Sequence, residues 1–420
     1  MKTATGTAIL MVALAAPAGA NAAEPDKILE TYSDIALAGY EDSLTTAKAL
    51  DAAIEALVAA PSDETLSAAR TAWLAARAPY QQTEAFRFGN AIVDEWEGRV
   101  NAWPLDEGLI DYVDASYGTE SDANAFYTVN VIANAQVSVG GETVDASTIT
   151  PDVIQSLQEI GGIEANVATG YHAIEFLLWG QDLNGTKPGA GSRPASDFDT
   201  ASCTNGNCDR RVQYLTAASD LLIADLEEMV ANWQTDGEAR ATLVGGDASA
   251  GLTAILTGLG SLSYGELAGE RMKLGLLLHD PEEEHDCFSD NTHNSHFYDV
   301  KGISNVYHGS YERIDGSTVS GPSLAELVRA ADAALADETE AKLSATLAAA
   351  EAMKARAEGG EAYDQMIGEG NEAGNAAVQA VIDGLVDQTR SLERVIAALD
   401  LGGVTIEGSD SLDNPGAVFE

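Results

Sequence analysis

The residues best suited to chemistry lie in one apolar segment, residues 170–180, which reads Gly-Tyr-His-Ala-Ile-Glu-Phe-Leu-Leu-Trp-Gly. His172 and Glu175 are three positions apart, so in a helix they lie on one face about one turn apart. A metal ion accepts both an imidazole nitrogen and a carboxylate oxygen. The alternative is a His–Glu pair satisfied inside a helical core. We favour a metal, because a carboxylate is costly to bury in so apolar a segment without a cation or strong partner.

Two glycines flank this pair. Gly170 has no side chain and would let another element approach closely. Gly180 is typical of a residue that ends a helix. The segment therefore predicts a short helix that carries His172 and Glu175 and stops before Gly180.

A second concentration of donors lies near residue 285. Four of the six histidines fall within eighteen residues, namely His279, His285, His293 and His296. Carboxylates such as Glu284 and Asp290 are interspersed with them, and such a mixed nitrogen and oxygen donor set suits iron, zinc or manganese. The alternative is a solvated acidic loop with incidental histidines, and we favour metal or ligand contact.

A third group pairs acids with arginines. Glu84 and Arg87 share a helix face, and a structural ion pair is the simpler interpretation. Alternatively, Arg87 orients a ligand carboxylate or holds an anionic ligand. Glu266, Glu270 and Arg271 present the same two alternatives on a later helix.

The elements that must position these residues are helical. Apolar residues recur at helical intervals in residues 27–60, and Pro61-Ser62-Asp63 separates that helix from one carrying Leu66 to Glu84. Further helices are expected at residues 156–179, 211–232, 251–278, 323–357 and 371–399. Strand-like alternation is scarce, so we expect an all-α fold of packed helical bundles.

The length of the chain and the position of a loop-rich segment predict two domains. The chain exceeds the roughly 250–300 residues that one hydrophobic core usually supports. We expect an N-terminal bundle over residues 23–180, a Gly-, Asn- and Pro-rich linker over 181–210, and a C-terminal bundle over 211–420. Residues 280–321 show no clear period, and a loop of that size is usually functional.

Charge and cysteines restrict the function classes. The net charge of −45, from 67 acidic and 22 basic residues, excludes non-specific binding to nucleic acid or anionic lipid. Residues 1–22 combine Lys2, an apolar stretch and Ala20-Asn21-Ala22, which predicts a secretory signal peptide. We expect no membrane span in the mature protein. Cys203 and Cys208 bracket an Asn-Gly turn, which in an exported protein indicates a local disulfide and leaves Cys287 over.

Several catalytic signatures do not occur in the sequence. It has no His-Glu-x-x-His, no phosphate-binding Gly-x-x-x-x-Gly-Lys and no Gly-x-Ser-x-Gly elbow. It also has no Cys-x-x-Cys-His for covalent haem. The remaining chemistry is metal binding by the histidines and acids described above.

These residues together resemble the imelysin family, also described as imelysin-type peptidases and as bacterial iron-regulated protein A. The family signature Gly-x-His-x-x-Glu is matched by Gly170, His172 and Glu175. The resemblance extends to residues 80–88, Asn101-Ala102-Trp103-Pro104, the Cys203/Cys208 loop with Arg210-Arg211, Gly269-Glu270-Arg271-Met272 and residues 284–293. It therefore covers nearly the whole mature chain, although no cysteine suited to lipid attachment follows the signal segment.

The resemblance implies two helical bundles with a site between them, a periplasmic or envelope-associated location, and a link to iron acquisition. His172 and Glu175 carry over as the signature pair, and other elements would complete the site. The predicted metal ligands are His172, Glu175, Glu84, Glu284, His285 and His293, supported by Arg87, Asp290, Glu270 and Arg271.

Three functions compete at this point. The first is metal binding in iron uptake, with a divalent or ferric ion, iron before zinc, and with an iron-containing ligand or envelope iron-transport components as partners. The second is a metallopeptidase that uses His172 and Glu175, although a hydrolytic zinc site needs three protein ligands, an open position and a base. The third is a helical module that binds haem or a protein. We favour metal binding over hydrolysis, and we favour both over a module that binds haem or a protein.

Overall fold

The structure is a computed structural model that describes residues 24–121, 124–139 and 141–419. The expected signal peptide, residues 1–22, lies outside the described residues. In the described residues the fold is all-α, as predicted, with two short antiparallel hairpins. In the first hairpin β1 (Gln136–Val139) pairs with β2 (Glu142–Asp145), and in the second β3 (Ser310–Glu312) pairs with β4 (Thr318–Ser320).

The first group of helices is built around α1 (Pro25–Ala59). Helices α2 (Asp63–Gln81) and α6 (Cys208–Trp233) pack along it, and α5 (Gly170–Trp179) packs on both α2 and α6. Ser62 begins α2, because its hydroxyl accepts a hydrogen bond from the backbone N–H of Thr65. Leu50, Ile54 and Leu57 of α1 are fully buried at helical spacing, so one apolar stripe holds this group together.

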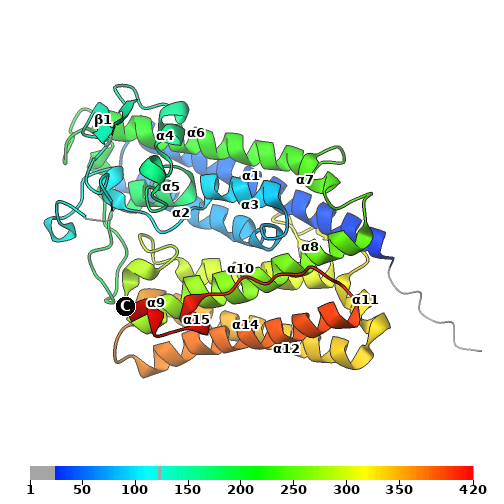
Figure 1. Cartoon of the computed structure of the whole chain (residues 1–420). Coiled ribbons are helices and arrows are strands. Elements are labelled where there is room, and N and C mark those ends of the chain that lie inside the picture. The colour runs from blue at the N-terminus through cyan, green and yellow to red at the C-terminus, as the bar shows by residue number, and fades with distance from the viewer. Residues whose placement is uncertain (1–23, 122–123, 140, 420) are drawn as a thin grey trace, which may run out of the picture.

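The second group is built around two long antiparallel helices, α12 (Ala333–Glu358) and α14 (Glu372–Ala398). Helix α10 (Thr292–His308) packs on α12, and it also contacts α2 of the first group. Helix α8 (Ala248–Ser261) contacts both α14 and α1. Figure 1 shows the two groups stacked, with α8 and α10 between the outer helices. The polar residues of interest therefore lie where the groups meet.

Shorter helices complete the structure: α3 (Ala91–Val100), α4 (Pro151–Leu157), α7 (Glu238–Ala241), α9 (Leu274–Leu278), α11 (Leu324–Ala331), α13 (Tyr363–Ile367) and α15 (Asp410–Asp413). Between α8 and α9 the chain forms a continuous π-helix, Leu262–Lys273. This wider helix is uncommon, and π segments within α-helices are frequent at functional sites. Within the described part of the chain, no helix is both long and apolar enough to cross a membrane.

Several sequence-based expectations about helices are wrong. The expected helix at residues 323–357 is divided at Asp332, which lies between α11 and α12. The expected helix at residues 156–179 is broken between α4 and α5, where Gly161 and Gly162 have positive φ angles of 77° and 70°. The expected loop at residues 280–321 contains the 17-residue helix α10. The sequence pattern concealed α10 because His293, His296 and Asp299 share its buried face with apolar residues.

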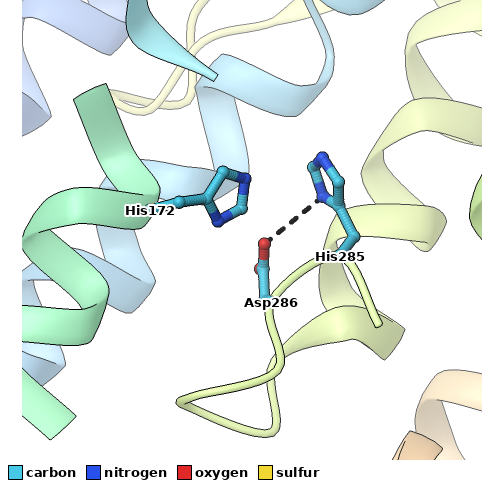
Figure 2. Close-up of side chains that lie close together, drawn as sticks. All are labelled: His172, His285 and Asp286. Carbon is cyan, nitrogen blue, oxygen red and sulfur yellow. Dashed lines mark ion pairs between the residues drawn. The ribbon is translucent and has the colours of Figure 1, made fainter. Parts of the chain in front are cut away.

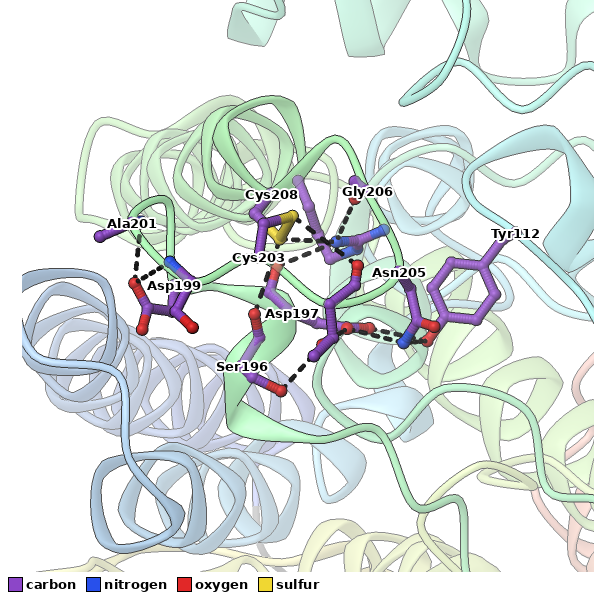
Figure 3. The surroundings of a disulfide bond; sticks show 12 residues. Tyr112, Ser196, Asp197, Asp199, Ala201, Cys203, Asn205, Gly206 and Cys208 are labelled. Atoms are coloured by element: carbon purple, nitrogen blue, oxygen red, sulfur yellow. Dashed lines mark hydrogen bonds between the residues drawn. A yellow bond between two sulfur atoms is a disulfide. The ribbon is translucent and has the colours of Figure 1, made fainter.

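The predicted disulfide between Cys203 and Cys208 is present, with an S–S distance of 2.03 Å (Figure 3). Arg211 stabilises this loop, because its Nη1 donates to the carbonyl oxygens of Asp197 at 2.9 Å and Gly206 at 3.1 Å. Helix α6, which begins at Cys208, packs along α1. The segment expected as a linker therefore leads back into the first group of helices, and the division into two domains at residues 181–210 stays a prediction.

Candidate metal centre

The position of His172 depends on a close contact at the start of α5. Gly170 has a φ of 77°, and a Cβ atom there would lie 2.3 Å from the carbonyl oxygen of Val100 at the end of α3. Only glycine tolerates both conditions. Gly180, with a φ of 71°, ends α5 as expected from the sequence. Both glycines therefore fix the short helix that carries His172 and Glu175.

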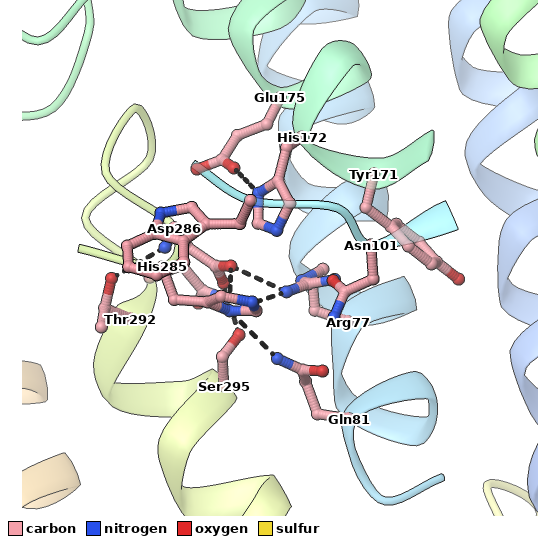
Figure 4. A network of polar contacts seen from close by, with 12 residues as sticks. Arg77, Gln81, Asn101, Tyr171, His172, Glu175, His285, Asp286, Thr292 and Ser295 are labelled. Carbon is pink, nitrogen blue, oxygen red and sulfur yellow. Dashed lines mark hydrogen bonds and ion pairs between the residues drawn. The ribbon is translucent and has the colours of Figure 1, made fainter. Parts of the chain in front are cut away.

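Glu175 holds the imidazole of His172 in place. Its Oε2 lies 3.0 Å from Nδ1 of His172 (Figure 4). Its Oε1 accepts hydrogen bonds from the N–H and hydroxyl of Ser289 at 3.0 and 2.7 Å. Nε2 of His172 is buried and has no hydrogen-bond partner among the described residues. A proton on Nδ1 directed at Glu175 leaves the Nε2 lone pair free for a metal.

His285 faces His172 from the segment that precedes α10 (Figure 2). The two ring centroids are 4.8 Å apart with an interplanar angle of 80°. Nδ1 of His285 lies 3.3 Å from Nη2 of Arg77 and 3.3 Å from Nε2 of Gln81. Both neighbours are donors, so Nδ1 presents its lone pair, and contacts this long are weak enough for a metal to replace.

Asp286 supplies a carboxylate beside the two imidazoles. Its Oδ1 accepts from Nη2 of Arg77 at 2.8 Å and lies 3.4 Å from Nδ1 of His285. Its Oδ2 accepts from Asn291 and Ser295. One potential ligand atom each from His172, His285 and Asp286 lies within 4.8 Å of the others, the only such trio in the described part of the chain.

The charges of this trio follow from burial and Arg77. Burial lowers the pKa of His172 to about 3 and the pKa of His285 well below its ordinary value, so both rings are neutral at neutral pH. Burial alone would raise the pKa of Asp286, but the Arg77 guanidinium and His285 hold it well below its usual range. Burial, then the Asp286 charge, raises the pKa of Glu175 well above its ordinary value, so a cation at Nε2 of His172 would be needed to keep Glu175 ionised opposite the Nδ1 proton. Neutral imidazoles and an ionised carboxylate are the forms that bind metals.

Of the predicted ligands, the structure brings together His172, Glu175 and His285. Sequence reasoning missed Asp286 and Arg77 as members of the site. Two sequence features could have identified them. Asp286 stands next to His285, and Arg77 lies on the buried stripe of α2 one turn after Trp73. Arg77 is itself fixed by Asn101, whose Oδ1 accepts from its Nη1 at 2.6 Å.

Glu84 lies in a different buried cluster. It pairs with Arg271 at 2.8 Å, and Arg271 also pairs with Glu266 and Asp299. The expected Glu84–Arg87 pair does not form in the described structure, because α2 ends at Gln81 and Glu84 turns toward the π-helix instead.

Arg87 instead contacts three other acids: Asp94, Glu97 and Glu266. Glu284, His293 and Asp290 lie outside the trio of His172, His285 and Asp286. Nε2 of His293 lies 3.1 Å from Nδ2 of Asn294.

Two cavities reach the trio from different directions. The first, about 430 Å³, is lined by His172 and His285 and by acids such as Glu107 and Glu282. The second, about 390 Å³, contains Glu270 and Arg271 in its wall. His285 and Trp103 line both cavities, so each cavity borders at least one member of the trio.

Comparisons with known proteins agree with this architecture. The sequence model of the imelysin family matches residues 36–392. Iron-regulated protein A of Synechococcus elongatus is 36% identical over 76 residues, which are 18% of this chain and 21% of that protein. The crystal structure of a protein provisionally described as an iron-regulated protein A precursor from Parabacteroides distasonis has a TM-score of 0.64 at 18% identity, and the match covers 91% of this chain and 97% of that chain. The match to this crystal structure shows that the two chains share a fold.

Proposed function

The chain belongs to the imelysin family, and we propose that it is an exported protein that binds a transition-metal ion, iron in preference to zinc, in the service of iron uptake. One observation carries this proposal: two buried, neutral imidazoles face each other beside an ionised carboxylate at the meeting point of two cavities. The iron-regulated names of the two similar proteins support iron as the favoured metal.

The donor set fits such an ion. Two imidazole nitrogens and one carboxylate oxygen are intermediate ligands that suit iron, zinc or manganese better than calcium or magnesium. Three protein ligands leave coordination positions open toward the cavities, where water or the chelator of an incoming ion can remain bound. Glu175 then acts through His172 by orienting its ring, and Arg77 keeps Asp286 ionised.

The surroundings also favour a cation. The first cavity is lined by Glu107, Asp182, Glu282 and Glu283, and the second by Glu97, Glu266 and Glu270. The whole chain carries a net charge of −45, which raises the local concentration of cations near its surface. These features support capture of a metal ion or of a cationic iron-containing ligand.

Hydrolysis is the second candidate, because three ligands and an open position also describe a catalytic zinc site. Such a site needs a general base near the metal-bound water. Glu175 has both of its oxygens engaged, with His172 on one side and Ser289 on the other. Binding without hydrolysis is therefore the better-supported function.

The test is metal content by elemental analysis and by calorimetric titration with Fe²⁺ under anaerobic conditions and with Zn²⁺. We expect one ion per wild-type chain, with losses in His172→Ala, His285→Ala and Asp286→Asn. His308→Ala is the matched control, because His308 is half-buried and contacts Glu340 far from the trio. Retention of the ion by both trio histidine variants would refute the proposal. Mass spectrometry of the periplasmic protein, with a start near Ala23 expected, tests export.

A further inference from the structure

A second group of acids lies on another side of the segment that carries His285 and Asp286. Four carboxyl groups contribute to it: Asp182, Glu284, Asp290 and Asp364. Asp182 follows α5, Glu284 and Asp290 precede α10, and Asp364 belongs to α13. These carboxyl groups from three distant segments are near enough to raise one another's pKa, although no three of them have ligand atoms within 4.8 Å of one another in the described chain.

These carboxylates are poorly satisfied by the protein. Glu284 and Asp364 are each only 1% exposed. Oε2 of Glu284, both carboxylate oxygens of Asp364 and Oδ1 of Asp290 are buried without a hydrogen-bond partner in residues 24–121, 124–139 and 141–419. A buried carboxylate oxygen with no protein partner is costly unless a proton, a water molecule or a cation satisfies it.

A small cavity adjoins the cluster. It measures about 10 Å³ and is lined by Asp182 and Glu284 together with Glu282 and Cys287. A space of roughly 10–15 Å³ holds one water-sized particle. The cavity therefore has room for a single ion or water, and it borders two of the four carboxylates, Asp182 and Glu284.

The charges around the cluster are of one sign. Burial, then the carboxylates of Asp364, Asp290 and Asp182, raises the pKa of Glu284 well above its ordinary value. Burial, then Asp364 and Asp182, raises the pKa of Asp290 to about 7. The largest influences on these two pKa values, apart from burial and the hydrogen bond between Glu284 and Thr292, are carboxylates. The compensation that Arg77 gives to Asp286 is thus missing here among the described residues.

We propose that a divalent cation of the calcium type binds between Asp182, Glu284, Asp290 and Asp364. An all-oxygen set of several carboxylates is the preference of such hard cations, in contrast to the histidine-containing trio. The four side chains must draw together on binding, because the trio of His172, His285 and Asp286 is the only set already within 4.8 Å in the described chain. Calcium tolerates such a flexible, irregular arrangement better than magnesium.

The bound cation would act as a clamp. It joins the loop after α5 to α13 and to the segment before α10. Thr186 of that loop already contacts Gly368 at the end of α13, where an added Cβ would lie 3.1 Å from the threonine Cβ. Because Glu284 directly precedes His285, the clamp also restrains the segment that carries two members of the trio.

The test is calorimetric titration of the chelator-treated full-length mature protein with Ca²⁺, at neutral pH with excess Mg²⁺ and physiological salt to suppress diffuse binding to the acidic surface. We expect one Ca²⁺ per chain, and an affinity that is at least about tenfold weaker in Glu284→Gln and Asp364→Asn. Glu369→Gln is the matched control, since it removes the same charge from an exposed position beyond α13. His172→Ala should bind Ca²⁺ normally, which separates this site from the transition-metal centre.

Thermal unfolding provides the second readout. In chelator, Asp364→Asn should be at least as stable as wild type, because the amide replaces an unpartnered buried carboxylate. Ca²⁺ should raise the melting temperature of wild type and of Glu369→Gln, and at the same Ca²⁺ concentration it should raise that of Asp364→Asn less. A wild-type melting temperature independent of Ca²⁺, or equal Ca²⁺ affinity in all variants, would show that protons or water fill the cluster and would overturn the proposal.

Discussion

Replacing Glu175 by glutamine tests whether this residue orients His172 for metal binding. In the native pair, Oε1 of Glu175 accepts two hydrogen bonds from Ser289, and Oε2 faces Nδ1 of His172 at 3.0 Å. A glutamine must keep its carbonyl oxygen toward the two Ser289 donors, so its NH₂ group faces Nδ1. Nδ1 then has to accept a hydrogen bond from this NH₂ group. The ring proton moves to Nε2 and occupies the position at which a metal would bind.

The expected loss in metal affinity for Glu175→Gln is about 10- to 100-fold, the usual effect of removing such an outer partner. This corresponds to about 1.4–2.8 kcal/mol, at 1.4 kcal/mol per factor of ten. Glu175→Ala leaves the ring free to choose either tautomer, so glutamine should weaken binding at least as much as alanine. Zinc titration calorimetry measures both, with Glu64→Gln at an exposed position of α2 as the control.

The outcome that contradicts this reasoning is specific. If Glu175→Gln binds zinc as tightly as wild type while Glu175→Ala does not, the carboxylate is not needed to set the tautomer. If zinc affinity falls but the crystal structure of the metal complex shows Glu175 coordinated, then Glu175 is itself a ligand and the trio is incomplete.

Three further predictions concern stability. Burial lowers the folded-state pKa of His296 to about 3, so the unfolded state binds the proton first and stability is lost as pH falls below about 6.5. Wild type should lose about 2 kcal/mol more than His296→Phe between about pH 7 and pH 5 in urea unfolding, and parallel pH profiles would contradict this. Replacing Cys203 and Cys208 by serine should cost about 2 kcal/mol, given the short loop, and an unchanged denaturation midpoint would refute it. Gly170→Ala should destabilise by about 1–3 kcal/mol or more, because its Cβ meets Val100, and a neutral result by thermal unfolding would show that α5 can shift.

Much of the fold could be predicted because its helices are amphipathic. The apolar period of residues 27–60 and 371–399 corresponds to α1 and α14 within two residues at each end. Helix α10 was missed because polar residues occupy part of its buried face, and buried polar side chains carry no period in hydrophobicity. The formation of such a helix depends on its tertiary contacts and not on a local hydrophobic period.

In the candidate site, too, local sequence patterns could be predicted and long-range contacts could not. His172 and Glu175 could be found because a local spacing of three residues already places them together. The contact of Arg77 with Asp286 joins residues 209 positions apart, and no local pattern predicts it. The expected ion pair between Glu84 and Arg87 is absent from the described residues, because Glu84 pairs with Arg271, which is distant in sequence.

The consecutive residues Glu284, His285 and Asp286 make the segment before α10 unusually intolerant of length changes. Its backbone is extended at Glu284, with φ −81° and ψ 140°, so the side chains of Glu284 and His285 diverge and serve different neighbours. Deleting or inserting a single amino acid here would present the wrong side chain to each neighbour at once. Variation among natural or engineered versions of this stretch should therefore consist of substitutions, with its spacing to α10 preserved.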